Sequence, residues 1–226
     1  FTDPKTILLE PEKTTLFIIS PEKNITEDHT IMLKNFLGSG GTVVLMDETG
    51  KINPILEELN IGVKIEPYQI MDPLYYYRSW KLPKITNINP TSQTTKNVTN
   101  IATNIPSAIK IENTQNIKVL AYTSHFSYMD LDGNEQPSKE DPVGPFPIAV
   151  EKSYGEGKIV VISDSSLFIN SIIELGDNKK LLKNIVGEKK AIVDSSLWNP
   201  SAHSRLKAFT QQAYNIISAP EIKYTL

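Results

Sequence analysis

Three aliphatic runs constrain the fold of this chain more than any other feature. They span residues 15–20 (TLFIIS), 42–46 (TVVLM) and 158–162 (KIVVI). Each run is short and continuous and is followed at once by a proline, an aspartate or a serine-aspartate pair, which is typical of strands buried on both faces. We expect the three runs to be adjacent central strands of one sheet, with their carboxyl ends at a shared edge.

Helix signals separate these strands. Thr26 is placed to cap a helix that Gly38 ends, and Pro54 suits the first turn of the next helix. A further strand over 63–65 completes a strand-helix-strand-helix-strand order, which predicts parallel βαβ units. In the second half we expect a hairpin turn over 154–157 and a helix over 177–186. Further strands are expected at 109–111, 119–123, 126–131, 147–150 and 191–193.

Together these elements predict one α/β domain over residues 1–226. The expected architecture is a three-layer sandwich with a mainly parallel sheet and antiparallel additions between residues 108 and 160. Residues 67–107, rich in Pro, Asn and Thr, predict a long irregular insertion, and such loops are often functional. Residues 195–226 are expected to form a C-terminal helix, over about 201–217, and a tail.

Charge and composition exclude several classes of protein. A net charge of −3 disfavours nucleic-acid binding, which usually needs a basic face. The absence of cysteine excludes disulfides, thiolate metal sites and a cysteine nucleophile. No apolar run reaches the length of a membrane span. Two sequons, at Asn24 and Asn97, would be glycan acceptors if the chain were exported.

Polar residues close to the ends of the predicted strands are the candidate ligand-binding residues. Ligands of open α/β sheets bind outside the carboxyl ends of the strands. The candidates are Ser20, Asp47, Asp164, Ser165 and Asn170. A purely structural role stays open for Asp164 and Ser165, because both are also placed to cap a following helix. Asp177 is likewise expected to cap a helix, with Asn178 stabilising a nearby loop.

No cofactor is expected. The glycines at 38–41 follow a helix instead of opening one, so they do not predict a phosphate loop. Asp130, Asp132 and Asn134 alternate around a glycine turn and are candidate calcium ligands, although Asp-Gly also favours a plain hairpin turn. No motif identifies a catalytic residue, although His125 follows a serine.

An aromatic cluster lies inside the predicted insertion, at residues 75–80 (YYYRSW). Tyr, Trp and Arg are enriched at binding hot spots, so the cluster would suit a sugar or a protein partner. The alternative is that the rings cover the sheet and hold the long loop in place. Both interpretations stay open at the level of the sequence.

An ordered set of motifs between about residues 15 and 200 resembles an uncharacterised family of archaeal and bacterial domains. The motifs lie at 15–21, 36–45, 53–56, 59–62, 122–130, 144–147, 155–164, 168–170 and 177–178. The resemblance implies a flavodoxin-like fold similar to class I glutamine amidotransferases, without their cysteine chemistry. It also implies an extracytoplasmic domain, with a membrane tether outside this chain, which would be part of a longer protein.

The predicted function is therefore a non-catalytic domain that binds a ligand or scaffolds a partner at the cell surface. The partner would be a protein or a carbohydrate, with no role for nucleic acid. The alternative is a hydrolase or transferase acting on a glycan or peptide, with Asp47, Asp164 or His125 at the edge of the sheet.

Overall fold

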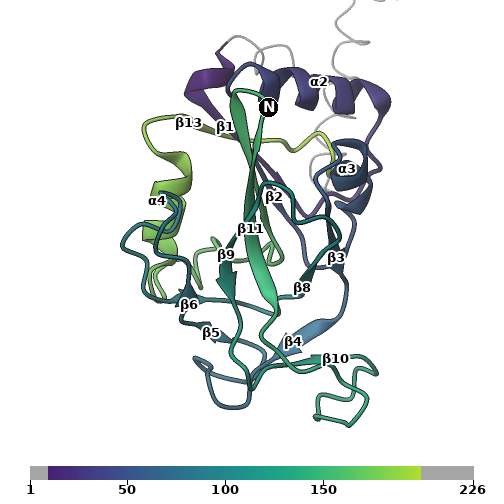
Figure 1. The fold of residues 1–226 in the computed structure, drawn as a ribbon, viewed down its shortest axis with the longest axis vertical. Coiled ribbons are helices and arrows are strands. Elements are labelled where there is room, and N and C mark those ends of the chain that lie inside the picture. Colours follow the sequence, from purple (N-terminus) through teal and green to yellow (C-terminus); the bar gives the residue numbers. More distant parts are fainter. Residues whose placement is uncertain (1–9, 200–226) are drawn as a thin grey trace, which may run out of the picture.

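The computed structural model describes residues 10–199, so the helix expected over 201–217 lies outside the described residues (Figure 1). Within them, no helix is both long enough and apolar enough to cross a membrane. The elements in chain order are η1 (Pro11–Lys13), β1 (Thr14–Ile19), α2 (Glu27–Gly38), β2 (Thr42–Met46), α3 (Asn53–Glu58), β3 (Val63–Glu66), β4 (Gln69–Met71), β5 (Lys84–Ile85), β6 (Asn87–Ile88), β7 (Ile101–Ala102), β8 (Ala108–Ile111), β9 (Ile117–Tyr122), β10 (Tyr128–Asp130), β11 (Pro147–Tyr154), β12 (Gly157–Ile162), α4 (Asn178–Val186) and β13 (Lys190–Val193).

Seven strands form the main sheet, in the order β13-β1-β2-β12-β11-β9-β6. The pairs β13–β1, β1–β2 and β2–β12 are parallel. The pairs β12–β11, β11–β9 and β9–β6 are antiparallel. The three aliphatic runs are confirmed as adjacent strands, β1, β2 and β12. The sheet as a whole is mixed, with its parallel half built from these runs.

Elements pack on both faces of the main sheet (Figure 1). Side chains alternate between the faces along each strand, because a strand has a period of two. Leu16 and Val43 pack with buried residues of α2 and α3 on one face. Phe17 and Val44 pack with α4 and with insertion residues such as Ile85 on the other. The insertion therefore supplies part of a layer.

Within residues 10–199, local signals correctly located α2, α3, α4 and the hairpin. Thr26 is confirmed as the cap of α2, where its side chain accepts from the His29 N–H. The predicted hairpin is the turn between β11 and β12. Gly157 allows β12 to begin directly against the end of α2. A Cβ there would lie 2.3 Å from the Gly41 carbonyl oxygen and 2.4 Å from the Leu37 carbonyl oxygen.

Two predicted strand pairings are wrong. β3, expected as a parallel strand after α3, pairs antiparallel with β8 in a separate two-stranded sheet. β10, expected as an addition to the main sheet, pairs antiparallel with β4 in another separate sheet. In both cases the strand was recognised from its composition, but its partner lies more than 35 residues away in the chain. Local sequence patterns do not specify such long-range pairings.

Candidate functional site

Asp47 directly follows β2, as predicted, but its carboxylate is fully buried. Its Oδ1 accepts from the Thr49 N–H (3.0 Å) and the Thr49 hydroxyl (2.6 Å). Its Oδ2 accepts from the Ile52 N–H (3.1 Å). These bonds close the turn that leads into α3, so the Asp47 carboxylate is not available to a ligand in this structure.

Asp164 follows β12 and is also buried, with a relative exposure of 1%. Burial raises the pKa of Asp164 to about 7, with a smaller contribution from the charge of Glu48. Hydrogen bonds from the Asn104 N–H (2.7 Å) and from the N–H and hydroxyl of Ser166 (both 2.9 Å) oppose this rise. Asp164 thus holds the insertion and the turn after β12 together. This role is structural, but it differs from the helix cap that the sequence suggested, because a turn and not a helix follows β12.

The other three predicted residues differ in their surroundings. Ser20 is half-buried with a φ of 42°, and its N–H donates to the Met46 carbonyl (2.8 Å). The Ser165 N–H donates to Glu48 Oε2 (2.8 Å). Asn170 is exposed. The structure therefore adds Glu48 to this edge of the sheet. Its place directly after Asp47 was the signal that could have identified it.

Insertion residues cover the carboxyl end of β12. The Ser107 N–H donates to the Ser163 carbonyl (2.9 Å), and the Ser163 hydroxyl donates to the Ser107 carbonyl (2.6 Å). The bond from the Asn104 N–H to Asp164 lies beside this pair. Chain from the insertion thus occupies the part of the sheet edge where a ligand was expected at Asp164.

A loop over residues 72–83 projects from the insertion and is held by its own hydrogen bonds. The buried Asp72 accepts from the Leu74 and Tyr75 N–H groups and from the Ser124 hydroxyl (2.6 Å). The Asp72 N–H donates to the Trp80 carbonyl (3.0 Å), which brings the two ends of the loop together. These bonds hold the conformation of the loop independently of any ligand.

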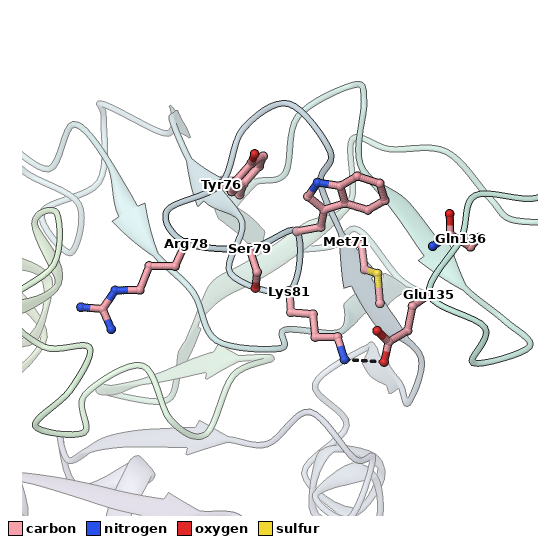
Figure 2. Close-up of a pocket in the computed structure, with 8 residues that line it drawn as sticks. Met71, Tyr76, Arg78, Ser79, Lys81, Glu135 and Gln136 are labelled. Atoms are coloured by element: carbon pink, nitrogen blue, oxygen red, sulfur yellow. Dashed lines mark hydrogen bonds and ion pairs between the residues drawn. The ribbon is translucent and has the colours of Figure 1, made fainter.

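This loop and the 131–141 turn border an open pocket of about 340 Å³ (Figure 2). Lys81 of the loop forms an ion pair with Glu135 of the turn. Figure 2 shows these two side chains meeting, with the Arg78 side chain directed away from them. The lining residues are Met71, Tyr76, Arg78, Ser79, Trp80, Lys81, Glu135 and Gln136. Such mixed apolar and polar lining is typical of ligand pockets, and the volume lies at the lower end of their range.

Large exposed apolar side chains lie in the 72–83 loop and in segments close to β4 and β10, and two of them, Tyr76 and Trp80, line the pocket. The Tyr75 and Phe126 rings stack with centroids 6.2 Å apart. We call the group the aromatic end; β4 and β10, which flank it, lie opposite α2 along the molecule (Figure 1). Its members, all more than one-third exposed, are Tyr68, Leu74, Tyr75, Tyr76, Trp80, Phe126, Leu131 and Val143.

The residues of the predicted aromatic cluster at 75–80 differ in their surroundings: one packs against the protein, and others are exposed to solvent. Tyr77 is the residue that packs: its hydroxyl donates to Asn100 Oδ1, and burial together with the charge of Asp177 raises its pKa. Tyr75, Tyr76 and Trp80 are exposed. The cluster therefore both anchors the loop and presents aromatic surface to solvent.

The candidate calcium residues lie in the turn after β10. Asp130 is buried and accepts from the Gly133 and Glu135 N–H groups, both at 3.0 Å. Asp132 accepts from the Asn134 N–H (3.1 Å) and side-chain amide (2.7 Å). Over residues 10–199, no group of three or more His, Cys, Asp or Glu side chains is placed to hold a metal ion. The carboxylates instead organise the turn that carries Glu135 and Gln136.

The fold is similar to those of several solved structures. The mmIFT52 N-terminal domain matches with a TM-score of 0.61 and 18% identity, over 80% of this chain and 78% of that one. Cytoplasmic protein STM1381 from Salmonella typhimurium LT2 matches with a TM-score of 0.50 and 12% identity, over 77% and 72% of the two chains. A putative ThuA-like protein from Bacteroides uniformis ATCC 8492 matches with a TM-score of 0.49 and 14% identity, over 83% and 74%. At these identities the first two show a shared fold alone.

The comparison of sequences points to a family without an assigned activity. No curated protein matches this chain. A family model matches residues 3–186, which include β1 to β12 and α4, and therefore both the main sheet and the insertion that carries the pocket. The chain belongs to the family described as a domain of unknown function, DUF4350.

Proposed function

We propose that this domain is a non-catalytic binding domain whose ligand or partner contacts the aromatic end. The observation that carries the proposal is the set of exposed aromatic and aliphatic side chains in the 72–83 loop and close to β4 and β10, two of which, Tyr76 and Trp80, line the pocket. Large exposed apolar patches on soluble proteins mark interaction sites, and Tyr and Trp dominate binding hot spots. The proposed binding site is therefore the aromatic end, formed by part of the insertion together with Phe126, Leu131 and Val143, instead of the edge of the sheet.

The relation between the insertion and the sheet supports this change. Asp47 and Asp164 have almost no exposed surface, and Asn104 and Ser107 of the insertion lie against the end of β12. A ligand at Asp164 would have to displace them. At the aromatic end, by contrast, Tyr75 and Phe126 are about half exposed. A partner there would bury apolar surface without disturbing the sheet.

Selection from a peptide-display library and a glycan array on the purified protein tests the proposal. We expect ligands whose affinity falls at least tenfold in the double variant Tyr75→Ser with Phe126→Ser, because the stacked pair loses its apolar area. The matched control is Ile31→Ser with Val193→Ser, which replaces two other exposed apolar residues. Ligands that bind the Tyr75/Phe126 variant as tightly as the unmodified protein would contradict the proposal.

We also propose that the domain is extracytoplasmic and tethered to a membrane in the full-length protein, as its family resemblance implies. Support comes from the two sequon asparagines, Asn24 and Asn97, which are both exposed. Protease added to intact cells that produce the full-length protein should degrade this domain while a cytoplasmic marker stays whole. Protection of the domain in intact cells, with digestion only after lysis, would contradict this location.

The finer fold assignment is likewise a proposal. We infer that the domain is glutamine amidotransferase-like, of archaeal or bacterial type, and that it lacks the activity of that class. The parallel order of β1, β2 and β12 supports the assignment, and a chain without cysteine has no thiol nucleophile. A superposition on that class in which β1, β2 and β12 do not align with its parallel strands would contradict it.

We do not adopt the hydrolase or transferase alternative. It depends on Asp47, Asp164 or His125 acting on a substrate at the edge of the sheet. Asp47 and Asp164 are buried, and their oxygens accept hydrogen bonds from neighbouring N–H and hydroxyl groups. His125 is exposed in the turn at 125–126, beside Phe126 of the aromatic end.

A further inference from the structure

The pocket at the aromatic end has a lining that restricts the chemistry of its ligand. We infer that it binds an uncharged saccharide, with a sugar ring against Trp80 and Tyr76. The inference rests on the proposed function, because it names the ligand class of the same surface. Three elements of the lining support this ligand class: its aromatic surface, its charge balance and its polar groups.

Aromatic surface in the pocket is the first element. Trp80 and Tyr76 are 36% and 41% exposed, and both line the pocket together with the buried Met71. The face of a sugar ring that carries its C–H groups is apolar, and it packs against flat aromatic rings. Two solvent-accessible rings in one pocket therefore provide a platform for such a face, and releasing water from them favours binding.

Charge balance is the second element. Lys81 and Glu135 form an ion pair, so their charges compensate each other within the lining. Arg78 also lines the pocket, but its side chain extends away from Lys81 and Glu135 (Figure 2). A phosphate or carboxylate at Lys81 would have to displace Glu135 from its ion pair. The paired charges therefore favour a neutral ligand beside Lys81 and Glu135.

The polar groups are the third element. Ser79, Gln136 and the Lys81–Glu135 pair present both hydrogen-bond donors and acceptors to the pocket. Sugar hydroxyls both donate and accept, so they match such a mixed set better than an apolar peptide side chain does. Hydrogen bonds within residues 72–83 already hold the loop in one conformation. Ligand binding would therefore cause only a small further loss of conformational entropy in the protein.

NMR signals of the tryptophan indole N–H groups provide a direct test, because the chain has two tryptophans and each gives one such signal. The Trp198 indole donates to the Ile19 carbonyl (2.7 Å), away from the pocket, and serves as an internal reference. The ¹⁵N-labelled protein would be titrated with neutral oligosaccharides of glucose, mannose, xylose and N-acetylglucosamine. Oligogalacturonate and an apolar peptide would be titrated in parallel. We expect at least one neutral oligosaccharide to shift the Trp80 signal to saturation while the Trp198 signal stays in place.

Variants then locate the site and test the role of charge by calorimetry. Trp80→Ala and Tyr76→Ala should each lower the affinity for the neutral oligosaccharide at least tenfold, whereas the distant Ile31→Ala should leave it unchanged. The double variant Lys81→Gln with Glu135→Gln keeps polar groups at both positions and removes both charges. Its affinity for a neutral saccharide should fall by less than the tenfold loss expected for Trp80→Ala, because the two amides still donate and accept hydrogen bonds.

Several results would overturn the inference. The first is that no neutral oligosaccharide shifts the Trp80 signal at millimolar concentration. The second is that the protein binds only oligogalacturonate or the peptide. The third is that saccharide affinity is unchanged in Trp80→Ala. If saccharides fail but display-selected ligands still depend on Tyr75 and Phe126, the inference fails and the proposed binding function stands. If those ligands do not depend on Tyr75 and Phe126 either, both are wrong.

Discussion

Replacing Asn178 with alanine is expected to lower the free energy of unfolding by about 3 kcal/mol, because it removes hydrogen bonds within the core. Asn178 is fully buried at the first turn of α4. Its Oδ1 accepts from the Ala102 N–H (2.9 Å), and its Nδ2 donates to the Ala102 carbonyl (2.8 Å). Nδ2 also lies 3.2 Å from the Leu167 carbonyl and 3.3 Å from the Ile172 carbonyl. Alanine would leave these backbone groups buried without a partner.

Asn184→Ala is the matched control for this prediction. Asn184 also lies on α4 and donates to an insertion carbonyl, that of Lys96 (2.8 Å). This hydrogen bond is exposed to solvent, so water can replace it. We expect its effect to stay below about 1 kcal/mol. Urea unfolding followed by circular dichroism measures both variants. A loss of less than 1 kcal/mol for Asn178→Ala would show that Asn178 does not hold the insertion to α4.

Stability is expected to fall as the pH rises through the range in which Asp164 ionises. Its pKa is raised from 3.8 when unfolded to about 7 in the fold, so the folded protein holds this proton more tightly than the unfolded chain. The contribution is complete below about pH 4 and is lost as the pH rises through about 7. A shift of this size corresponds to a few kcal/mol.

The difference in unfolding free energy between the unmodified protein and Asp164→Asn isolates this effect, since asparagine does not titrate. We expect this difference to decrease between pH 5 and pH 8. Asp177→Asn is the control. The hydrogen bond from Lys180, together with bonds from Thr99, lowers the pKa of Asp177, so the corresponding difference should stay constant over this range. A constant difference for Asp164→Asn as well would mean that Asp164 is ionised throughout.

Both predictions concern contacts that join the insertion to the rest of the chain. Asn178 holds β7, and Asp164 holds Asn104, so the two residues act from the main body on residues 101–104. Weakening either contact should therefore loosen the segment that covers the end of β12. The same insertion also carries the 72–83 loop, with Tyr75, Tyr76 and Trp80 of the aromatic end.

The sequence predicted the elements whose signals are local. The runs of β1, β2 and β12 were recognised because a continuous apolar run between turn residues is typical of a buried strand. Thr26 marked the start of α2, and Gly155 and Gly157 marked the hairpin between β11 and β12. These residues were informative because they act on their immediate neighbours. Asp177 shows the limit: it occupies the predicted cap position of α4, yet its carboxylate accepts from Thr99 and Lys180.

Only the tertiary structure decided which strands pair over long distances and which polar side chains are buried. β3 pairs with β8 and β4 pairs with β10 through contacts that no local pattern specifies. The ligand role predicted for Asp47 and Asp164 depended on exposure, and exposure is set by the whole fold. The pocket joins Trp80 to Glu135, which are distant in sequence. Residue types and spacing determine local structure, whereas burial and the meeting of distant segments depend on how the complete chain packs.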